Sequence, residues 1–129
     1  MFHSFKNQDE RRAFGGTAFM EFQYCKLKPK TRIRKILRRV PYWQDGGLYV
    51  HWQDMYCFFS NYEEIFGDAV LSNVKGATGM DPYGVNYFSS AQMKDIIEKI
   101  EEQKPLDYEI LLEWLKKGTD YNGFYVLGL

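Results

Sequence analysis

The spacing of apolar residues in the last third of the chain constrains the fold more than any other sequence feature. In "SSAQMKDIIEKI" (89–100), four apolar residues recur at the three- and four-residue intervals of a buried helix stripe, and Ser89 or Ser90 can cap the start. Beyond Pro105, "DYEILLEWLKKG" repeats the pattern and ends at Gly118. The buried residues of these two predicted helices are Met93, Ile96, Ile97 and Ile100 in the first, and Leu111, Trp114 and Leu115 in the second.

Shorter patterns predict elements in the first half. "TAFMEFQYCKL" (17–27) alternates with period two and is partly apolar on both sides, which favours a central strand. "LYVHW" (48–52) follows a "QDGG" turn and predicts a second strand. "MYCFFSNYEEIFG" (55–67) has the length of a helix that Asp54 caps and Gly67 ends, although its aromatic density leaves a strand open.

The remaining segments have weaker patterns. Residues 1–15 predict either a short helix around "NQDERRAF" or a loosely ordered arm, and "TDYNGFYVLGL" a turn before an apolar tail that must be buried or paired. In the irregular stretch 68–82, "KGATGMDPYG" lacks the phosphate-loop pattern and predicts a surface loop. We expect a turn over 81–84, with Tyr87 and Phe88 packing beside the following helix or at the edge of the core.

A chain of 129 residues that is 45% hydrophobic can build one core. We therefore predict a single compact α+β domain over residues 1–129, with a small β-sheet and about four helices.

The formal net charge of zero conceals a strong separation of charge. Residues 1–39 hold 11 Lys and Arg against 3 Asp and Glu, whereas residues 40–129 hold 6 against 14. Such a dipole is either satisfied internally or presents two faces of opposite sign to partners.

The basic half contains a predicted amphipathic helix, "KPKTRIRKILRRV" (28–40). Its apolar stripe comprises Ile33, Ile36, Leu37 and Val40, and the opposite arc carries Arg34, Lys35, Arg38 and Arg39. The basic part of this helix, 30–39, offers nucleic-acid binding as an alternative function. The acidic remainder of the chain favours instead a solvated or internally paired basic face.

Acidic residues in the second half are interleaved with aromatic ones, a combination that suits recognition of a basic protein partner. Glu63, Glu64 and Asp68 lie near Tyr62, while Asp45 and Asp54 bracket the strand before Trp52. The predicted partner-binding residues are Asp45, Trp52, Asp54, Tyr62, Glu63, Glu64 and Asp68. For each residue taken singly, a solvated charge or a core ring is the simpler interpretation, and exposed aromatics equally suit a homodimer.

Catalytic and metal-binding patterns are weak. His51 near Asp54 or Cys57 could form a base or a Cys/His pair, but no third orienting group can be placed, and a structural histidine is favoured. No H-E-x-x-H or C-x-x-C spacing occurs, so we expect no metal site, no cofactor and no enzyme activity, with Cys25 and Cys57 as reduced thiols.

The N-terminal stretch lacks the order of a signal peptide, and the longest strongly apolar run is "MYCFF". We therefore expect a cytoplasmic protein without a membrane partner.

From Tyr83 onward, the sequence combines an aromatic turn, a capped helix, a Trp-bearing helix and an "NGFY" tail. In this pattern, over roughly its last third, the chain resembles small bacterial immunity proteins of polymorphic toxin systems, including those of contact-dependent growth inhibition. The resemblance carries over no functional residue. It implies a cytosolic, non-enzymatic inhibitor that binds a cognate toxin tightly, commonly a nuclease with a basic cleft.

Overall fold

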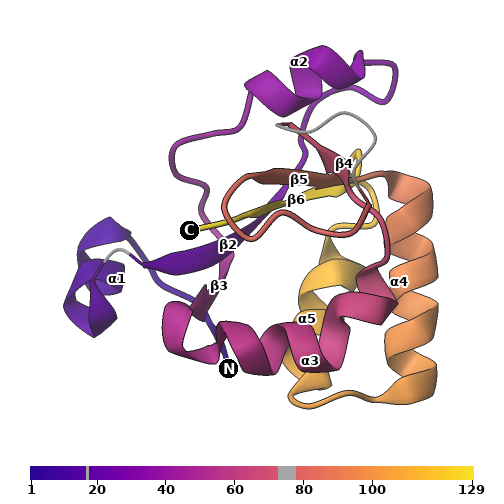
Figure 1. Cartoon of the computed structure of the whole chain (residues 1–129). Helices are drawn as coiled ribbons and strands as arrows, with labels where there is room; N and C mark the ends of the chain where they lie inside the picture. The colour runs from indigo at the N-terminus through magenta and orange to yellow at the C-terminus, as the bar shows by residue number, and fades with distance from the viewer. Residues whose placement is uncertain (17, 73–77) are drawn as a thin grey trace.

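A computed structural model describes residues 1–16, 18–72 and 78–129 of the chain (Figure 1). In chain order the elements are β1 (Phe2–His3), α1 (Gln8–Gly15), β2 (Phe19–Tyr24), α2 (Ile33–Arg38), β3 (Leu48–His51), the 3₁₀ helix η1 (Trp52–Asp54), α3 (Met55–Phe66), β4 (Val70–Leu71), β5 (Val85–Phe88), α4 (Ser90–Gln103), α5 (Tyr108–Lys117) and β6 (Phe124–Leu127). The predicted single α+β domain is confirmed, with five α-helices in the described residues where about four were expected.

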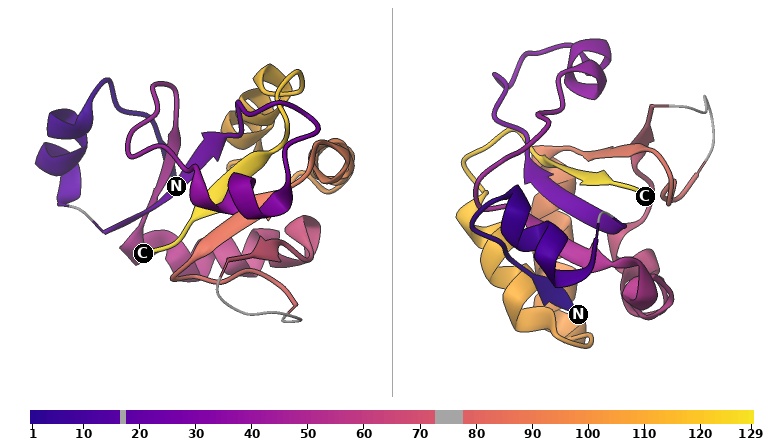
Figure 2. Two further views of the ribbon diagram at one scale, coloured as in Figure 1. Left: turned by 90° about the horizontal axis from the view of Figure 1, so that it is seen from above. Right: turned by 90° about the vertical axis from the view of Figure 1, so that its left-hand side faces the viewer.

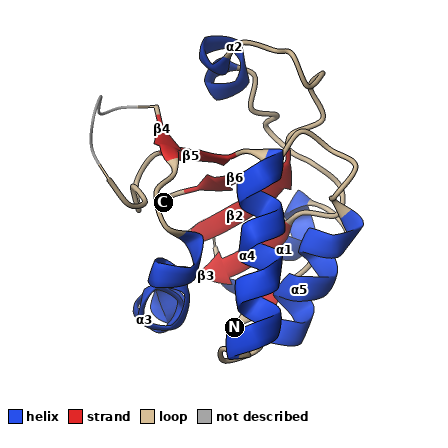
Figure 3. Ribbon diagram, turned by 90° about the vertical axis from the view of Figure 1, so that its right-hand side faces the viewer, coloured by secondary structure: helices blue, strands red, loops and turns tan. Residues whose placement is uncertain are grey.

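The strands form one antiparallel sheet in the order β1-β3-β2-β6-β5-β4. The strand expected at 17–27 is β2 and is central, between β3 and β6, although Thr17 lies outside the described residues. The apolar tail is also paired, because β6 inserts between β2 and β5. The first and last thirds of the chain thus meet at the centre of the sheet (Figure 3).

Three helices, α3, α4 and α5, cover one face of the sheet and enclose the main core (Figures 1 and 3). Phe58 of α3 is fully buried and contacts the rings of Phe2, Phe22, Tyr62 and Phe66. Edge-to-face pairs dominate this cluster, as the ring quadrupole favours. All seven residues predicted for the buried stripes of the two C-terminal helices are buried here.

The start of α4 is closed by a capping box. Ser89 Oγ accepts a hydrogen bond from Gln92 N at 3.2 Å, and Gln92 Oε1 accepts one from Ser89 N at 2.8 Å. Asp107 is the N-cap residue of α5, but its side chain accepts from the amino group of Met1 at 3.1 Å and makes no cap bond. Asp54 occupies the expected N-cap position of α3, but its side chain makes no cap hydrogen bond either.

The opposite face of the sheet is covered more thinly, by α1 and α2. It carries polar groups beneath its cover: Tyr49 Oη donates to Glu21 Oε1 at 3.0 Å, and Gln23 Nε2 donates to the same oxygen at 2.9 Å. The helix expected over 28–40 is only Ile33–Arg38, and Ile33 is 46% exposed rather than buried. The expected four-residue stripe is therefore reduced to Ile36, with Leu37 and Val40 half-buried.

Three strands were not predicted: β1, β4 and β5. Tyr87 and Phe88 lie within β5, each side chain on a different face of the sheet, rather than as a staple for the next helix. Part of the predicted surface loop, residues 75–77, lies outside the described residues.

Candidate functional site

A groove with a mainly apolar lining lies between α3 and the loop that precedes β5. Its volume is about 570 Å³, and we call it the aromatic groove. It is lined by Trp52, Met55, Tyr56, Phe59, Glu63, Met80, Pro82, Tyr83 and Leu129. A neighbouring hollow of about 500 Å³ shares Trp52 and Leu129 with it, so the two form one continuous surface.

One wall of the aromatic groove comes from η1 and α3. Trp52, Tyr56, Phe59 and Glu63 follow one another at intervals of four, three and four residues, which places them on one helix stripe. The backbone at the start of this stripe is held in place, because Trp52 N donates to Ala18 O at 2.9 Å. Trp52 is 50% exposed and Tyr56 85% exposed, so both rings are available to a partner.

The other wall is the turn at 81–84, which is held by the buried side chain of Asn86. Asn86 Oδ1 accepts from Asp81 N at 2.6 Å, and Asn86 Nδ2 donates to Asp81 O at 2.8 Å and to Val126 O at 2.9 Å. Gly84 N completes the expected turn by donating to Asp81 O at 3.4 Å. Asn86 thus couples the turn to the centre of the sheet.

Backbone bonds fix the same turn from a second direction. Gly128 N donates to Gly84 O at 2.8 Å, and Leu129 N donates to Pro82 O at 2.9 Å. Tyr83, between these two points, has a ring that is 74% exposed. The turn therefore presents an exposed ring from a fixed backbone. This preorganisation reduces the conformational entropy that is lost when a partner binds.

The aromatic groove carries a negative charge. Glu63 is its charged side chain, and no Lys, Arg or His of the described residues lines it. Apolar rings around one carboxylate favour an apolar anchor flanked by positive charge.

The structure brings together only two of the seven predicted partner-binding residues, Trp52 and Glu63. Glu64 is exposed on α3 but outside the groove lining. Tyr62 is fully buried, and its hydroxyl donates to Leu106 O at 2.5 Å. Its ring belongs to the core and is not available to a partner, because position 62 is on the inner side of α3.

The other three predicted residues lie elsewhere. Asp45 precedes β3, at the opposite end of that strand from Trp52, and accepts from Trp43 Nε1 at 2.9 Å. Asp54 is half-buried at the end of η1 and does not line the groove. Asp68 Oδ1 accepts from Gly79 N at 2.6 Å, so this carboxylate shapes the loop beside the groove.

Sequence reasoning missed seven groove residues: Met55, Tyr56, Phe59, Met80, Pro82, Tyr83 and Leu129. The α3 members could have been found, because their spacing from Trp52 is helical. Tyr83 could not, since its position opposite α3 depends on the pairing of β5 with β6.

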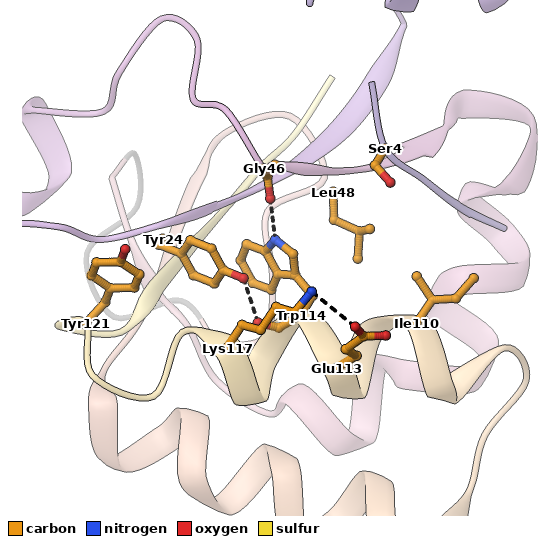
Figure 4. A pocket seen from close by; sticks show the side chains of 10 residues that line it. Ser4, Tyr24, Gly46, Leu48, Ile110, Glu113, Trp114, Lys117 and Tyr121 are labelled. Atoms are coloured by element: carbon orange, nitrogen blue, oxygen red, sulfur yellow. Dashed lines mark hydrogen bonds and ion pairs between the residues drawn. The ribbon is translucent and has the colours of Figure 1, made fainter. Parts of the chain in front are cut away.

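A separate hollow of about 460 Å³, away from the aromatic groove, lies beside α5 (Figure 4). Its wall is the stacked pair Tyr24 and Trp114, with ring centroids 4.1 Å apart. Trp114 Nε1 donates to Gly46 O at 2.7 Å, and Glu113 pairs with Lys117 at 3.1 Å. Burial raises the pKa of Tyr24 to about 12. The polar groups drawn in Figure 4 largely satisfy one another, as expected for a packing seam.

The histidines are held structurally. His51 Nδ1 accepts from Gln53 N at 3.3 Å, which leaves Nε2 to donate to Gly15 O at 3.3 Å. Burial and the nearby amino group of Met1 lower the pKa of His3. Nowhere in residues 1–16, 18–72 and 78–129 do three or more His, Cys, Asp or Glu side chains gather as metal ligands.

The predicted basic face forms a separate surface. Arg34, Lys35, Arg38 and Arg39 are exposed and together line a shallow hollow of about 260 Å³ over α2. No helix in the described part of the chain has the length and apolar character of a transmembrane span.

Comparisons with family models, with curated proteins and with solved structures give no match to this chain.

Proposed function

We propose that the chain is a non-enzymatic, cytoplasmic binding protein whose aromatic groove takes a basic protein partner, as an immunity protein does when it neutralises a cognate bacterial toxin. The observation that carries this proposal is the set of three exposed rings, Trp52, Tyr56 and Tyr83, on two fixed walls around Glu63. Large rings at a preformed groove are the usual binding hot spots in protein complexes.

The chemistry of the partner follows from the lining. An aliphatic or aromatic side chain fills the space between Tyr56 and Tyr83, and a Lys or Arg beside it pairs with Glu63. The exposed Glu64 extends the negative charge along α3 and steers the approach of a basic surface.

The test uses the product of the neighbouring gene, if it carries a toxic C-terminal domain, as the partner. We expect co-expression to restore growth, and calorimetry to give a complex of equal stoichiometry. Tyr56→Ala or Tyr83→Ala raises Kd by about 30-fold or more, because each removes a hot-spot ring. Glu63→Gln mainly lowers the association rate and its salt dependence.

Tyr42→Ala is the matched control, because Tyr42 is 82% exposed and does not line the groove. Binding that is unchanged in the Tyr56 and Tyr83 variants, or equally weakened in the Tyr42 variant, contradicts the proposal. A homodimer that these variants dissociate, seen by sedimentation, assigns the groove to a second copy of the chain instead.

A further inference from the structure

The positive charge of this protein is concentrated in one short segment, residues 26–39, which we call the basic segment. It holds eight Lys and Arg and no Asp or Glu within 14 residues. The other 115 residues hold 9 Lys and Arg against 17 Asp and Glu. The segment therefore carries a formal charge of +8 and the rest of the chain −8.

The cations of the basic segment are not neutralised within the described chain. All eight are exposed: Lys26, Lys28, Lys30, Arg32, Arg34, Lys35, Arg38 and Arg39. None of the five ion pairs formed by the described residues includes any of them. Internal pairing, which the sequence left open, does not account for this charge.

The basic segment is held away from the acidic helices. Helix α2 lies on the other side of the sheet from α3, α4 and α5 (Figures 1 and 2). Ile36 is buried against the rings of Tyr87 and Tyr125, and Tyr125 Oη donates to Ile36 O at 2.6 Å. These contacts point the apolar side of α2 inward, so that the arc with Arg34 and Arg38 faces outward.

Four cations converge on the outer side of α2. Arg34, Lys35, Arg38 and Arg39 line the same hollow of about 260 Å³, and no carboxylate of the described residues lines it. Like charges held this close repel one another, and a bound anion relieves that repulsion. The hollow is open and below the usual size of an enclosed small-molecule pocket, which favours a polymer that lies across it.

We infer that the basic segment binds the phosphate backbone of a nucleic acid without sequence specificity. Four of the eight cations are arginines, whose planar guanidinium groups match phosphate oxygens in pairs. Tyr42, three residues after Arg39, is 82% exposed and offers a ring for base stacking. An anionic membrane fits less well, because Ile36 and Leu37 face the sheet and the exposed apolar side chains beside the basic arc are few, namely Ile33 and Tyr42.

The acidic remainder does not prevent this interaction. Salt screens exposed charges beyond about 8 Å at physiological ionic strength, and α2, which carries Arg34, Lys35 and Arg38, lies on the face of the sheet opposite the acidic helices α3 and α4. The site is separate from the aromatic groove, so either surface can function when the other is disabled.

The test measures fluorescence anisotropy of a labelled 20-nucleotide single strand, and of a matching duplex, with the whole chain at 50 to 200 mM salt. We expect Kd of about 1–100 μM near 150 mM salt, with a steep loss of affinity as salt rises. The fourfold variant Arg34→Gln, Lys35→Gln, Arg38→Gln and Arg39→Gln reduces the logarithmic salt slope for the single strand by about 3 and affinity at 50 mM salt by about 100-fold.

The matched control neutralises Lys94, Lys99, Lys116 and Lys117 on α4 and α5 to Gln, which changes the net charge equally. If the position of the charges matters, the nucleic-acid affinity of this control variant falls by less than about threefold, because the charges that contact the phosphates, rather than the net charge, set the salt slope. Circular dichroism and thermal unfolding verify that both variants keep the fold, and Tyr56→Ala verifies that the groove is not involved.

Three results overturn the inference. They are an absence of binding to either probe at 50 mM salt, an equal loss in the control variant, and binding to phosphatidylserine vesicles that exceeds nucleic-acid binding and disappears in the fourfold variant. The last result assigns the segment to a membrane surface. None of them affects the groove, whose test uses a protein partner.

Discussion

The two faces of the sheet differ in how they are held together. On the face covered by α3, α4 and α5, interlocked aromatic and aliphatic side chains form a continuous core. On the other face, α1 has no buried residue, and α2 has one, Ile36. The first face buries the larger hydrophobic cluster, so we expect it to supply most of the stability, whereas the second holds the charged segment with few buried residues.

The packing of each face matches the kind of partner that we propose for the surface it supports. The aromatic groove is built on α3, whose inner side belongs to the main core, so that its rings have a fixed base. The basic segment is attached through a small cluster around Ile36, which leaves its long side chains free to follow an irregular polyanion.

The largest expected effect is on the helix-covered face. Phe58→Ala removes a fully buried ring that contacts Phe2, Phe22 and Phe66, and we expect the free energy of unfolding to fall by about 3–5 kcal/mol. Urea denaturation monitored by fluorescence measures it. A loss below about 1 kcal/mol would show that this core tolerates a cavity and that the comparison is wrong.

A smaller, local effect is expected for Ile36→Ala, the corresponding deletion on the other face. Because α2 is short and Ile36 is its one buried residue, we expect α2 to open locally, and the expected loss is about 2 kcal/mol, at the low end for such a truncation. Hydrogen exchange should speed up across α2 while β2 and β6 stay protected. Equal acceleration in all three would mean that both faces unfold as one unit.

The smallest effect is expected for Tyr125→Phe, which removes the hydrogen bond to Ile36 O. At neutral pH the cost is about 1 kcal/mol, the usual net value of one such bond. The urea midpoint measures it, and Tyr56→Phe, on an exposed ring, is the control.

The same variant has a pH signature. Burial, with Cys25 nearby, raises the pKa of Tyr125, and burial raises that of Tyr87 to about 12. A raised pKa in the folded state means that stability is present below pH 10, where the unfolded tyrosine keeps its proton, and is lost as pH rises above 10. Tyr125→Phe therefore flattens the alkaline loss by up to about 1.4 kcal/mol per pH unit. An unchanged alkaline slope would show that Tyr125 ionises normally in the folded protein.

Sequence patterns predicted the elements whose residues contact one another locally. The stripe of α4, the inward residues of α5 and the end of α3 at Gly67 all follow from spacing along the chain. Strands β1 and β4, of two residues each, and β5, of four, gave no such signal and were missed, whereas β3, also of four residues, was predicted from "LYVHW".

For the candidate surfaces, the sequence alone determined the residue types: an acidic, aromatic second half and eight unopposed cations between Lys26 and Arg39. Only the tertiary structure decided which of them meet. Tyr62 was turned into the core and Asp45 placed at the far end of β3, while the pairing of β5 with β6 brought Tyr83 opposite Tyr56. The physical reason is that helical periodicity is a property of neighbouring residues, whereas strand pairing joins residues about 40 positions apart, such as Asn86 and Val126, through bonds that no local pattern encodes.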